Sequence, residues 1–229
     1  MNDREIEALR ETVALANRVV HHTGLTTYLG HASARIPGTD RVLIKRNGTI
    51  AVSMDTTTVK DILMADLDGN QLDGQSVGKL PAEWPLHAEI YKARPDVRSV
   101  VHCHPPHATA FAVAREPIPQ CVLPEVEVFL GEVPMTRYET PGGQAFADTI
   151  RPFVDKTNVI ILANHGTLSY GECVERAYWW TEILDAYCRI LMLARGLGGI
   201  NYFDPQQERQ LLDLKREWGF SDPRNTTEH

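Results

Sequence analysis

The chain has 229 residues, of which 43% are hydrophobic and 23% are charged, and its formal net charge is −7. This length and composition predict one globular domain over residues 1–229, ending in a loose polar tail from residue 221. The negative charge argues against a nucleic-acid partner, because phosphate binding needs a basic face. No stretch approaches the roughly 18 consecutive apolar residues of a membrane span, and the N-terminus lacks a signal-peptide pattern, so we expect no membrane association and a cytoplasmic location.

The first predicted elements are a helix and a strand. From about Glu5 to Val20, apolar residues recur at three- and four-residue spacing, and Asn2 with Glu5 can form a capping box. This pattern predicts an amphipathic helix. The apolar run 41–45 then predicts a strand, and Asn47-Gly48 predicts a hairpin turn directly after it.

The middle of the chain continues with alternating strand and helix patterns. An apolar run at 62–64 is followed by Asp-Gly turns, and Pro81 precedes a predicted helix from residue 83 to residue 93. Residues 97–104 are rich in valine and stop at two prolines, which cannot continue a strand. We therefore expect a strand that ends in a histidine.

A second strand of this kind is expected near residue 160. Residues 159–163 are wholly apolar and are followed by the turn sequence Asn164-His165-Gly166. Residues 174–197 repeat apolar side chains at helical spacing, and glycines close the segment. We expect a buried strand that ends near His165, and then a long helix.

Three histidines follow or end these two strands. In a strand, side chains two residues apart point to the same face, so His102 and His104 project together and Cys103 points the opposite way. His165 follows the other buried strand in a similar setting and can complete a three-imidazole metal site with one open position. An HxH pair alone is a weak signal, because two nearby histidines are as often structural.

Two further residues are candidates beside the metal. Glu83 can be a first-turn acid favoured by the helix dipole, but partial burial beside Trp84 would let its carboxyl exchange protons near neutral pH. His107 lies three residues beyond His104 and could replace His165 as a ligand. Because two prolines carry it away from the strand face, we assign it to substrate contact instead.

Taken together, these motifs resemble the class II aldolase/adducin N-terminal domain family. The resemblance runs from residue 30 to the end of the long helix near residue 196, and its strength lies in the joint order of the motifs. The segments that carry it are Gly30-His31-Ala32-Ser33, Glu83-Trp84-Pro85-Leu86-His87, Arg94-Pro95-Asp96, Val100-Val101-His102-Cys103-His104 and Asn164-His165-Gly166.

The resemblance implies both a fold and a site. It implies an α/β (α+β) three-layer sandwich, with a central, largely antiparallel sheet flanked by helices, and a homotetramer with its active site near a subunit interface. It also implies one divalent metal ion per subunit on His102, His104 and His165, with Glu83 as the catalytic acid/base. Zinc is the favoured ion, and iron, manganese and cobalt remain alternatives.

The chain departs from the aldolase pattern where those enzymes bind phosphate. Pro81-Ala82 replaces the small hydroxyl residues expected before the catalytic Glu, and His31 occupies an asparagine position. A basic segment replaces the hydroxyl residues of another phosphate loop. Since histidine, lysine and arginine form charge-assisted bonds to a carboxylate, we expect a small carboxylated, unphosphorylated substrate bound by His31, Lys45, Arg46, Asn47, Gly48 and His107.

The preferred hypothesis is a metal-dependent carbon-carbon lyase that decarboxylates an unphosphorylated, hydroxylated aromatic carboxylic acid in aromatic compound catabolism. Some members of the resembled family decarboxylate such acids. The residues 118–125 contain no tyrosine to match the proton donor that aldolases take from a neighbouring subunit, which disfavours aldol cleavage. The alternatives are an aldolase for a hydroxy-oxo acid or sugar-derived substrate, an Fe(II) oxygenase, and a non-catalytic adducin-like interaction module.

Overall fold

A computed structural model describes residues 1–47, 53–73, 78–220 and 222. Its centre is a six-stranded sheet in the order β3-β2-β1-β4-β6-β5, in which all neighbouring strands pair antiparallel. The strands are β1 (Gly30–Arg35), β2 (Arg41–Lys45), β3 (Ile62–Asp66), β4 (Ser99–Cys103), β5 (Val159–Leu162) and β6 (Gly166–Gly171).

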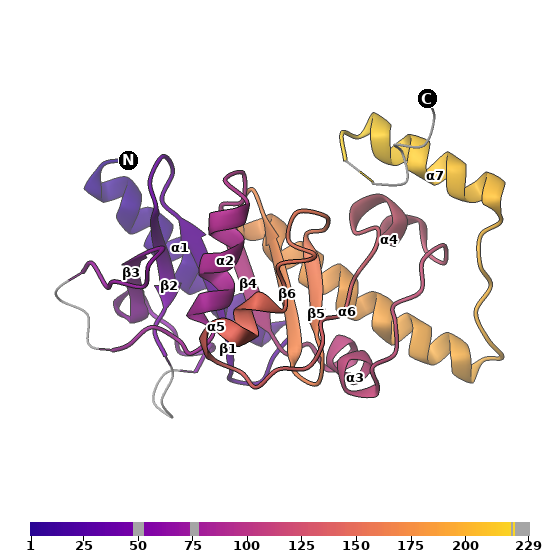
Figure 1. The fold of residues 1–229 in the computed structure, drawn as a ribbon, viewed down its shortest axis with the longest axis horizontal. Coiled ribbons are helices and arrows are strands. Elements are labelled where there is room, and N and C mark those ends of the chain that lie inside the picture. The colour runs from indigo at the N-terminus through magenta and orange to yellow at the C-terminus, as the bar shows by residue number, and fades with distance from the viewer. Residues whose placement is uncertain (48–52, 74–77, 221, 223–229) are drawn as a thin grey trace.

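Helices cover both faces of this sheet, as Figure 1 shows. The three-layer α/β sandwich with a largely antiparallel sheet, expected from the sequence, is confirmed. The helical elements are α1 (Asp3–His22), the short η1 (Val59–Asp61), α2 (Trp84–Ala93), α3 (Pro106–Ala114), α4 (Pro124–Phe129), α5 (Gly143–Asp148), α6 (Val174–Gly196) and α7 (Pro205–Glu217). None of the described helices is long and apolar enough to cross a membrane.

Alternation along the strands divides the core between the two faces. On β4, Val100 packs with α2 and α5, whereas Val101 and Cys103 pack with α1 and α6. On β1, Ala32 and Ala34 also face α1. The side chains at positions 31 and 33 therefore point to the α2 face, because successive residues of a strand alternate. Cys103 points away from the histidine face, as expected.

The predicted elements agree well with the structure at their centres and less well at their ends. The capping box of α1 forms between Asn2 and Glu5, as expected. Strand β4 ends at Cys103, so His104 follows the strand instead of ending it. The predicted turn at Asn47-Gly48 extends into residues outside the described ones, and β1 and β2 are joined by residues 36–40 instead.

The predicted loose tail contains one residue that is firmly held. Asp222 is 5% exposed and accepts a 2.8 Å bond from Nζ of the buried Lys215 in α7. The other residues of that segment, 221 and 223–229, lie outside the described part of the chain. At Asp222, burial of the carboxylate is compensated by this ion pair.

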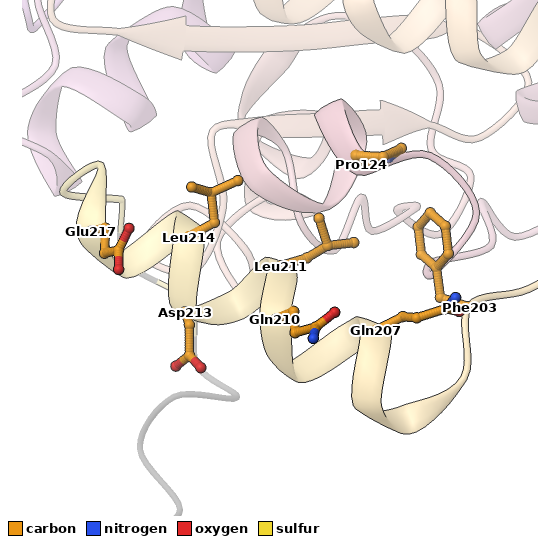
Figure 2. Close-up of a pocket in the computed structure, with 8 residues that line it drawn as sticks. All are labelled: Pro124, Phe203, Gln207, Gln210, Leu211, Asp213, Leu214 and Glu217. Carbon is orange, nitrogen blue, oxygen red and sulfur yellow. The ribbon is translucent and has the colours of Figure 1, made fainter.

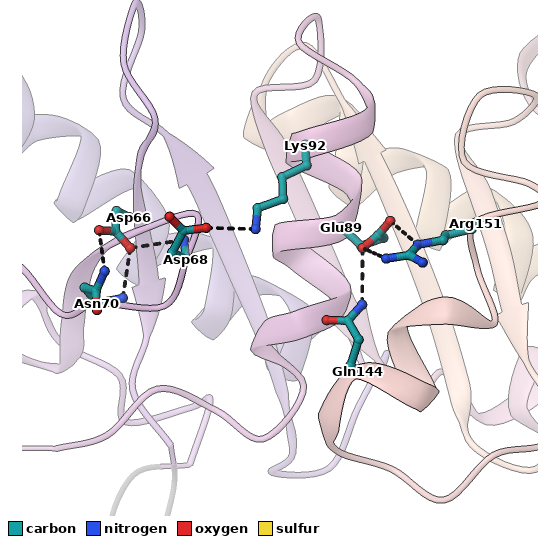
Figure 3. Close-up of polar contacts among 7 residues, drawn as sticks. All are labelled: Asp66, Asp68, Asn70, Glu89, Lys92, Gln144 and Arg151. Carbon is teal, nitrogen blue, oxygen red and sulfur yellow. Dashed lines mark hydrogen bonds and ion pairs between the residues drawn. The ribbon is translucent and has the colours of Figure 1, made fainter.

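Helix α2 is held on both sides by polar contacts, as Figure 3 shows. Lys92 pairs with Asp68 in the turn after β3, and Glu89 pairs with Arg151 and accepts from Gln144 of α5. These contacts are largely exposed, and exposed ion pairs contribute little to stability. The buried side of α2, including Leu86 and Ile90, should therefore dominate its attachment.

This view of α2 predicts different costs for two substitutions. Ile90→Ala should lower the free energy of unfolding by about 2–5 kcal/mol, because it leaves a cavity in the core. Lys92→Ala should cost less than about 1 kcal/mol, because it removes one exposed ion pair. Urea unfolding of both variants measures the difference. Equal losses would show that the ion pairs hold the helix.

Candidate metal centre

The strand register brings three imidazoles together at one end of the sheet. His102 lies on β4, His104 directly follows this strand, and His165 lies in the turn between β5 and β6. One ligating atom from each of the three lies within 4.8 Å of the others. The ring centroids are 4.9 to 5.1 Å apart. The turn that delivers His165 uses Asn164 in the left-handed region, with φ 55°.

This arrangement fits one divalent ion. His102 Nδ1 is 2.9 Å from the carbonyl oxygen of Thr167, which fixes the proton on Nδ1 and leaves Nε2 as a bare nitrogen. His102 Nε2 lies 3.2 Å from His165 Nε2, and His104 Nε2 is buried without a hydrogen-bond partner among the described residues. Unpartnered nitrogens that converge in this way are expected of a metal site.

Burial keeps the three histidines neutral. It lowers the pKa of His104 to about 4, and it lowers the pKa values of His102 and His165 as well, with the neighbouring histidines adding to the effect at His102 and His104. A metal ligand must be the neutral imidazole. These side chains therefore need not lose a proton to bind an ion at neutral pH.

Gly166 allows the close approach between the two histidine-bearing segments. A Cβ at this position would lie 2.5 Å from the carbonyl oxygen of Cys103 and 2.5 Å from Cδ2 of His104. A side chain on the first residue of β6 would therefore push His104 or the β4 backbone out of place. The glycine of the Asn-His-Gly turn is thus required by packing as well as by the turn.

A cavity of about 310 Å³ opens beside the three histidines, and its size suits a small molecule. Helix α2 places Glu83 at its N-cap, where the carboxylate makes no capping bond. The cavity is lined by Tyr28, Leu29, Gly30, His31, Lys45, Asn47, Ala82, Glu83, His102, His104, Pro141 and His165.

Two groups in this cavity have shifted pKa values. Burial raises the pKa of Glu83, and nearby Lys45 partly offsets the rise. Burial also lowers the pKa of Lys45 to about 8, although Asp61 and Glu83 oppose the decrease. Lys45 is 1% exposed. The cavity thus combines a carboxyl group that is easier to protonate with a cation that is easier to deprotonate.

The structure brings together some of the predicted substrate-binding residues and not others. His31, Lys45 and Asn47 line the cavity, and Gly48 lies outside the described residues. Arg46 is absent from the lining and pairs with Asp61 at 2.9 Å, because neighbouring residues at the end of β2 point in different directions.

His107 is also directed elsewhere. Its Nδ1 bonds to Asp185 of α6 at 2.8 Å, and the same carboxylate accepts the backbone N–H groups of His107 and Ala108. His107 therefore belongs to the capped start of α3. The sequence does not single out Leu29 or Pro141 as lining residues, because both lie in loops that lack a recognisable pattern.

A larger cavity of about 480 Å³ lies elsewhere, between α7 and the start of α4, as Figure 2 shows. It is lined by Pro124, Phe203, Gln207, Gln210, Leu211, Asp213, Leu214 and Glu217. These residues include no histidine or cysteine. The smaller cavity beside the histidines is therefore the better candidate for chemistry.

The fold and this three-histidine site define a class of metal-binding α/β proteins, and comparison with known proteins identifies the family. The family model described as "Class II Aldolase and Adducin N-terminal domain" matches residues 11–192. The chain belongs to this family. Members of the class II aldolases depend on divalent metal ions, which agrees with the histidine cluster.

The relatives of the chain differ in activity. It is 33% identical over 204 residues to a 3,4-dihydroxyphthalate decarboxylase of Arthrobacter keyseri, covering 83% of this chain and 80% of the relative. It is 28% identical to an L-ribulose-5-phosphate 4-epimerase of Salmonella paratyphi A, covering 87% and 91%. The solved structure of an L-fuculose 1-phosphate aldolase has the same fold, with a TM-score of 0.82 at 21% identity, covering 91% and 96%.

Substitution of Gly166 tests how the site is built. Gly166→Ala should weaken zinc binding by about tenfold to a hundredfold, because the added methyl group displaces His104. Gly196→Ala is the matched control, because a Cβ there meets nothing within 4 Å. Competition with a chelator measures both affinities. Unchanged zinc affinity in Gly166→Ala would contradict the described approach of β4 and β6.

Lys45 should reduce stability at neutral pH. Its pKa in the fold, about 8, is below the unfolded value of 10.5, so below pH 8 the ammonium bears its full burial cost in the fold. Lys45→Met should therefore raise the free energy of unfolding by about 1–3 kcal/mol at pH 7. The gain should shrink between pH 8 and 10.5, where the folded lysine is neutral and the unfolded one still charged.

Urea unfolding at pH 7 and pH 9.5 measures this gain. Lys92→Met is the control, because the Lys92 side chain is exposed and its replacement should change stability little at either pH. A Lys45→Met variant that is less stable than the wild type at pH 7 would show that the ammonium is better compensated than its burial implies.

Proposed function

We propose that this chain is a metal-dependent carbon-carbon lyase that decarboxylates an unphosphorylated, hydroxylated aromatic acid. The observation that carries the proposal is the lining of the histidine cavity, in which Lys45 and His31 lie with Glu83 and the three-histidine cluster. Ala82 lines the cavity where a phosphate-binding relative is expected to offer a hydroxyl group. The 33% identity to a 3,4-dihydroxyphthalate decarboxylase supports the same substrate class.

In this proposal His102, His104 and His165 hold one divalent ion, with zinc favoured by the all-imidazole set and iron, manganese or cobalt as alternatives. When bound, the ion supplies Lewis acidity toward the hydroxyl oxygens of the substrate. No ligand other than these three imidazoles is required from the chain. An open coordination position then remains for the substrate.

The side chains of the cavity bind and orient the acid. Lys45 provides a buried positive charge for a substrate carboxylate, and a charge-assisted hydrogen bond of this kind is stronger than a neutral one. His31 and Asn47 also line the cavity and offer further polar contacts. Binding of the carboxylate would also relieve the burial cost of the Lys45 ammonium.

Glu83 holds the proton that the reaction consumes. As the carbon-carbon bond to the carboxylate breaks, carbon dioxide leaves and the electron pair stays on the ring carbon. Glu83 gives its proton to that carbon and regains one from water. The raised pKa of this carboxyl increases the fraction that carries a proton near neutral pH.

Aldol cleavage of an unphosphorylated hydroxy-oxo acid is a second candidate. One observation favours it: Tyr28 lines the cavity and is 56% exposed, so its phenol can donate a proton to a leaving group. The aldolase would release an aldehyde or pyruvate and no carbon dioxide. The same metal and the same Glu83 would serve both reactions.

We also propose that residues 1–229 act as one cytoplasmic domain within a homotetramer. The three core clusters all include strands of the one sheet, which supports a single domain. The end of α6 exposes large apolar side chains that a subunit interface would cover: Ile190, Met192, Leu193 and Leu197. Light scattering of the purified protein measures the number of subunits.

Glu83→Gln tests the proposed chemistry. The amide retains the size of the side chain and removes its exchangeable acid, so kcat for carbon dioxide release from 3,4-dihydroxyphthalate should fall by about a hundredfold or more. The zinc content should remain one ion per chain. Wild-type protein is assayed with a panel of hydroxylated aromatic acids and hydroxy-oxo acids.

Glu89→Gln is the matched control, because Glu89 lies on the same helix and pairs with Arg151 outside the cavity. It should retain wild-type activity. Aldehyde or pyruvate release from the hydroxy-oxo acids, without carbon dioxide from any acid, would replace the decarboxylase by the aldolase. Oxygen consumption with a bound Fe(II) would favour an oxygenase instead.

A further inference from the structure

A group of buried polar side chains extends from the cavity into the layer between the sheet and α2. His31 and Ser33 lie on β1, and His87 and Tyr91 lie one turn apart on α2. His87 and Ser33 are fully buried, Tyr91 is 1% exposed and His31 is 6% exposed. Ser33, His87 and Tyr91 have no part in the metal binding proposed above. Because an unpaired polar group is costly when buried, each donor and acceptor of these side chains is expected to have a partner.

Three of these residues are joined by short contacts. Ser33 Oγ lies 2.8 Å from the Tyr91 hydroxyl and 2.8 Å from His87 Nδ1. Among the described residues, its one further acceptor is the carbonyl oxygen of Val100, at the longer distance of 3.5 Å. Burial raises the pKa of Tyr91, so its hydroxyl retains the proton.

The direction of these hydrogen bonds follows from the partners. Either hydroxyl can donate in the contact between Tyr91 and Ser33; the arrangement that gives both hydroxyl protons a side-chain acceptor at 2.8 Å is the one in which Tyr91 donates to Ser33. Ser33 then donates to the nearer of its acceptors, His87 Nδ1. Burial lowers the pKa of His87 to about 3, so the ring is neutral and carries its one proton on Nε2.

His87 Nε2 therefore needs an acceptor, and it is buried without a partner among the described residues. His31 Nδ1 is buried and unpartnered in the same way. The two ring centroids are 6.4 Å apart. This separation is too large for a direct hydrogen bond between ring nitrogens, but it suits one bridging water with a donor on one side and an acceptor on the other.

We propose that Tyr91, Ser33 and His87 form a positioning relay that, through one buried water, makes His31 Nδ1 an acceptor and places the proton of His31 on Nε2. His31 then donates a hydrogen bond into the cavity. It acts on a substrate carboxylate or hydroxyl oxygen, and its protonated nitrogen cannot serve as a fourth metal ligand. The assignment to a substrate oxygen rests on the proposed function, whereas the relay itself does not.

This assignment distinguishes two neighbouring histidines by the ring nitrogen that carries the proton. His31 and His102 are paired residues on β1 and β4, and their rings are stacked at 6.2 Å with 17° between their planes. His102 bonds through Nδ1 to the carbonyl of Thr167 and so offers a bare Nε2. His31 receives a hydrogen bond at Nδ1 and so offers an N–H. Of these two adjacent imidazoles, His102 is thus a metal ligand and His31 is a hydrogen-bond donor.

Two substitutions of His87 distinguish this role from a purely structural one. In His87→Asn, the amide oxygen takes the place of Nδ1 and can accept from Ser33, but the side chain is too short to reach the bridging water. In His87→Gln, the amide nitrogen takes the place of Nε2 and can still donate to that water. If His87 only accepts a hydrogen bond from Ser33, the His87→Asn variant should bind the ligand more tightly than the His87→Gln variant. If His87 acts through the relay, the His87→Gln variant should bind the ligand more tightly than the His87→Asn variant.

The readout is calorimetric binding of phthalate, a non-reacting aromatic dicarboxylate, to the zinc-loaded protein. His87→Asn should weaken binding by about tenfold or more, and His87→Gln should remain within a few fold of the wild type. In a His31→Ala background, His87→Asn should have no further effect, because the relay acts only through His31. A reversed order of the two variants, or a full additional loss in that background, would overturn the proposal.

The wild-type protein provides a test that needs no variant to fold and no catalytic activity. A neutron crystal structure should show a water between His87 Nε2 and His31 Nδ1, and deuterium on Nε2 of both rings. Deuterium on His31 Nδ1, or no water between the rings, would overturn the relay. If the water and protons are as stated and no acid is decarboxylated, the relay holds and the proposed function fails.

Discussion

The antiparallel pairing of β1, β4 and β6 is the constraint on which the site depends. It places His31 opposite His102 and brings Gly166 against the end of β4. Because a shift of one residue would turn every side chain to the other face, the register that buries Val101 and Cys103 against α1 also orients His102 toward the cavity. The hydrophobic pattern of the sheet therefore fixes the direction of the metal-binding side chains.

The chemistry of the cavity results from burial of groups that prefer water. The same low exposure that keeps His102 and His104 neutral also makes Lys45 a costly cation and Glu83 an easily protonated acid. Perturbed groups of opposite kinds in one cavity are expected of an active site. The cost of holding them is offset by the extensive cores on both faces of the sheet.

Much of this arrangement could be predicted from the sequence. The spacing of apolar residues and the prolines and glycines that end an element are local signals. The alternation of 97–104 and the two prolines after it locate β4 to within a residue or two, and the apolar run 159–163 locates β5. The family follows from the order of motifs around Glu83, His102 and His165. The short helices α3, α4 and α5 lack a clear apolar stripe and are missing from the sequence-based prediction. Helix α7 is missing as well, although Asp204 and Gln207 form a capping box that the sequence offers.

Side-chain direction at strand ends could not be predicted from the sequence. Lys45 and Arg46 are adjacent basic residues, yet Lys45 lines the cavity and Arg46 pairs with Asp61. His107 resembles a third site histidine in sequence, but Asp185 on the distant α6 holds it at the start of α3. Partners that lie far apart in the chain decide these cases, and no local pattern encodes them.

The proposed chemistry depends on one divalent ion held jointly by His102, His104 and His165. Anomalous diffraction at the zinc absorption edge, from crystals of the zinc-loaded protein, locates this ion. We expect one strong peak per chain, at bonding distance from one nitrogen of each of the three histidines. A peak that contacts His31 in place of one of them, or no peak beside these histidines, would contradict it.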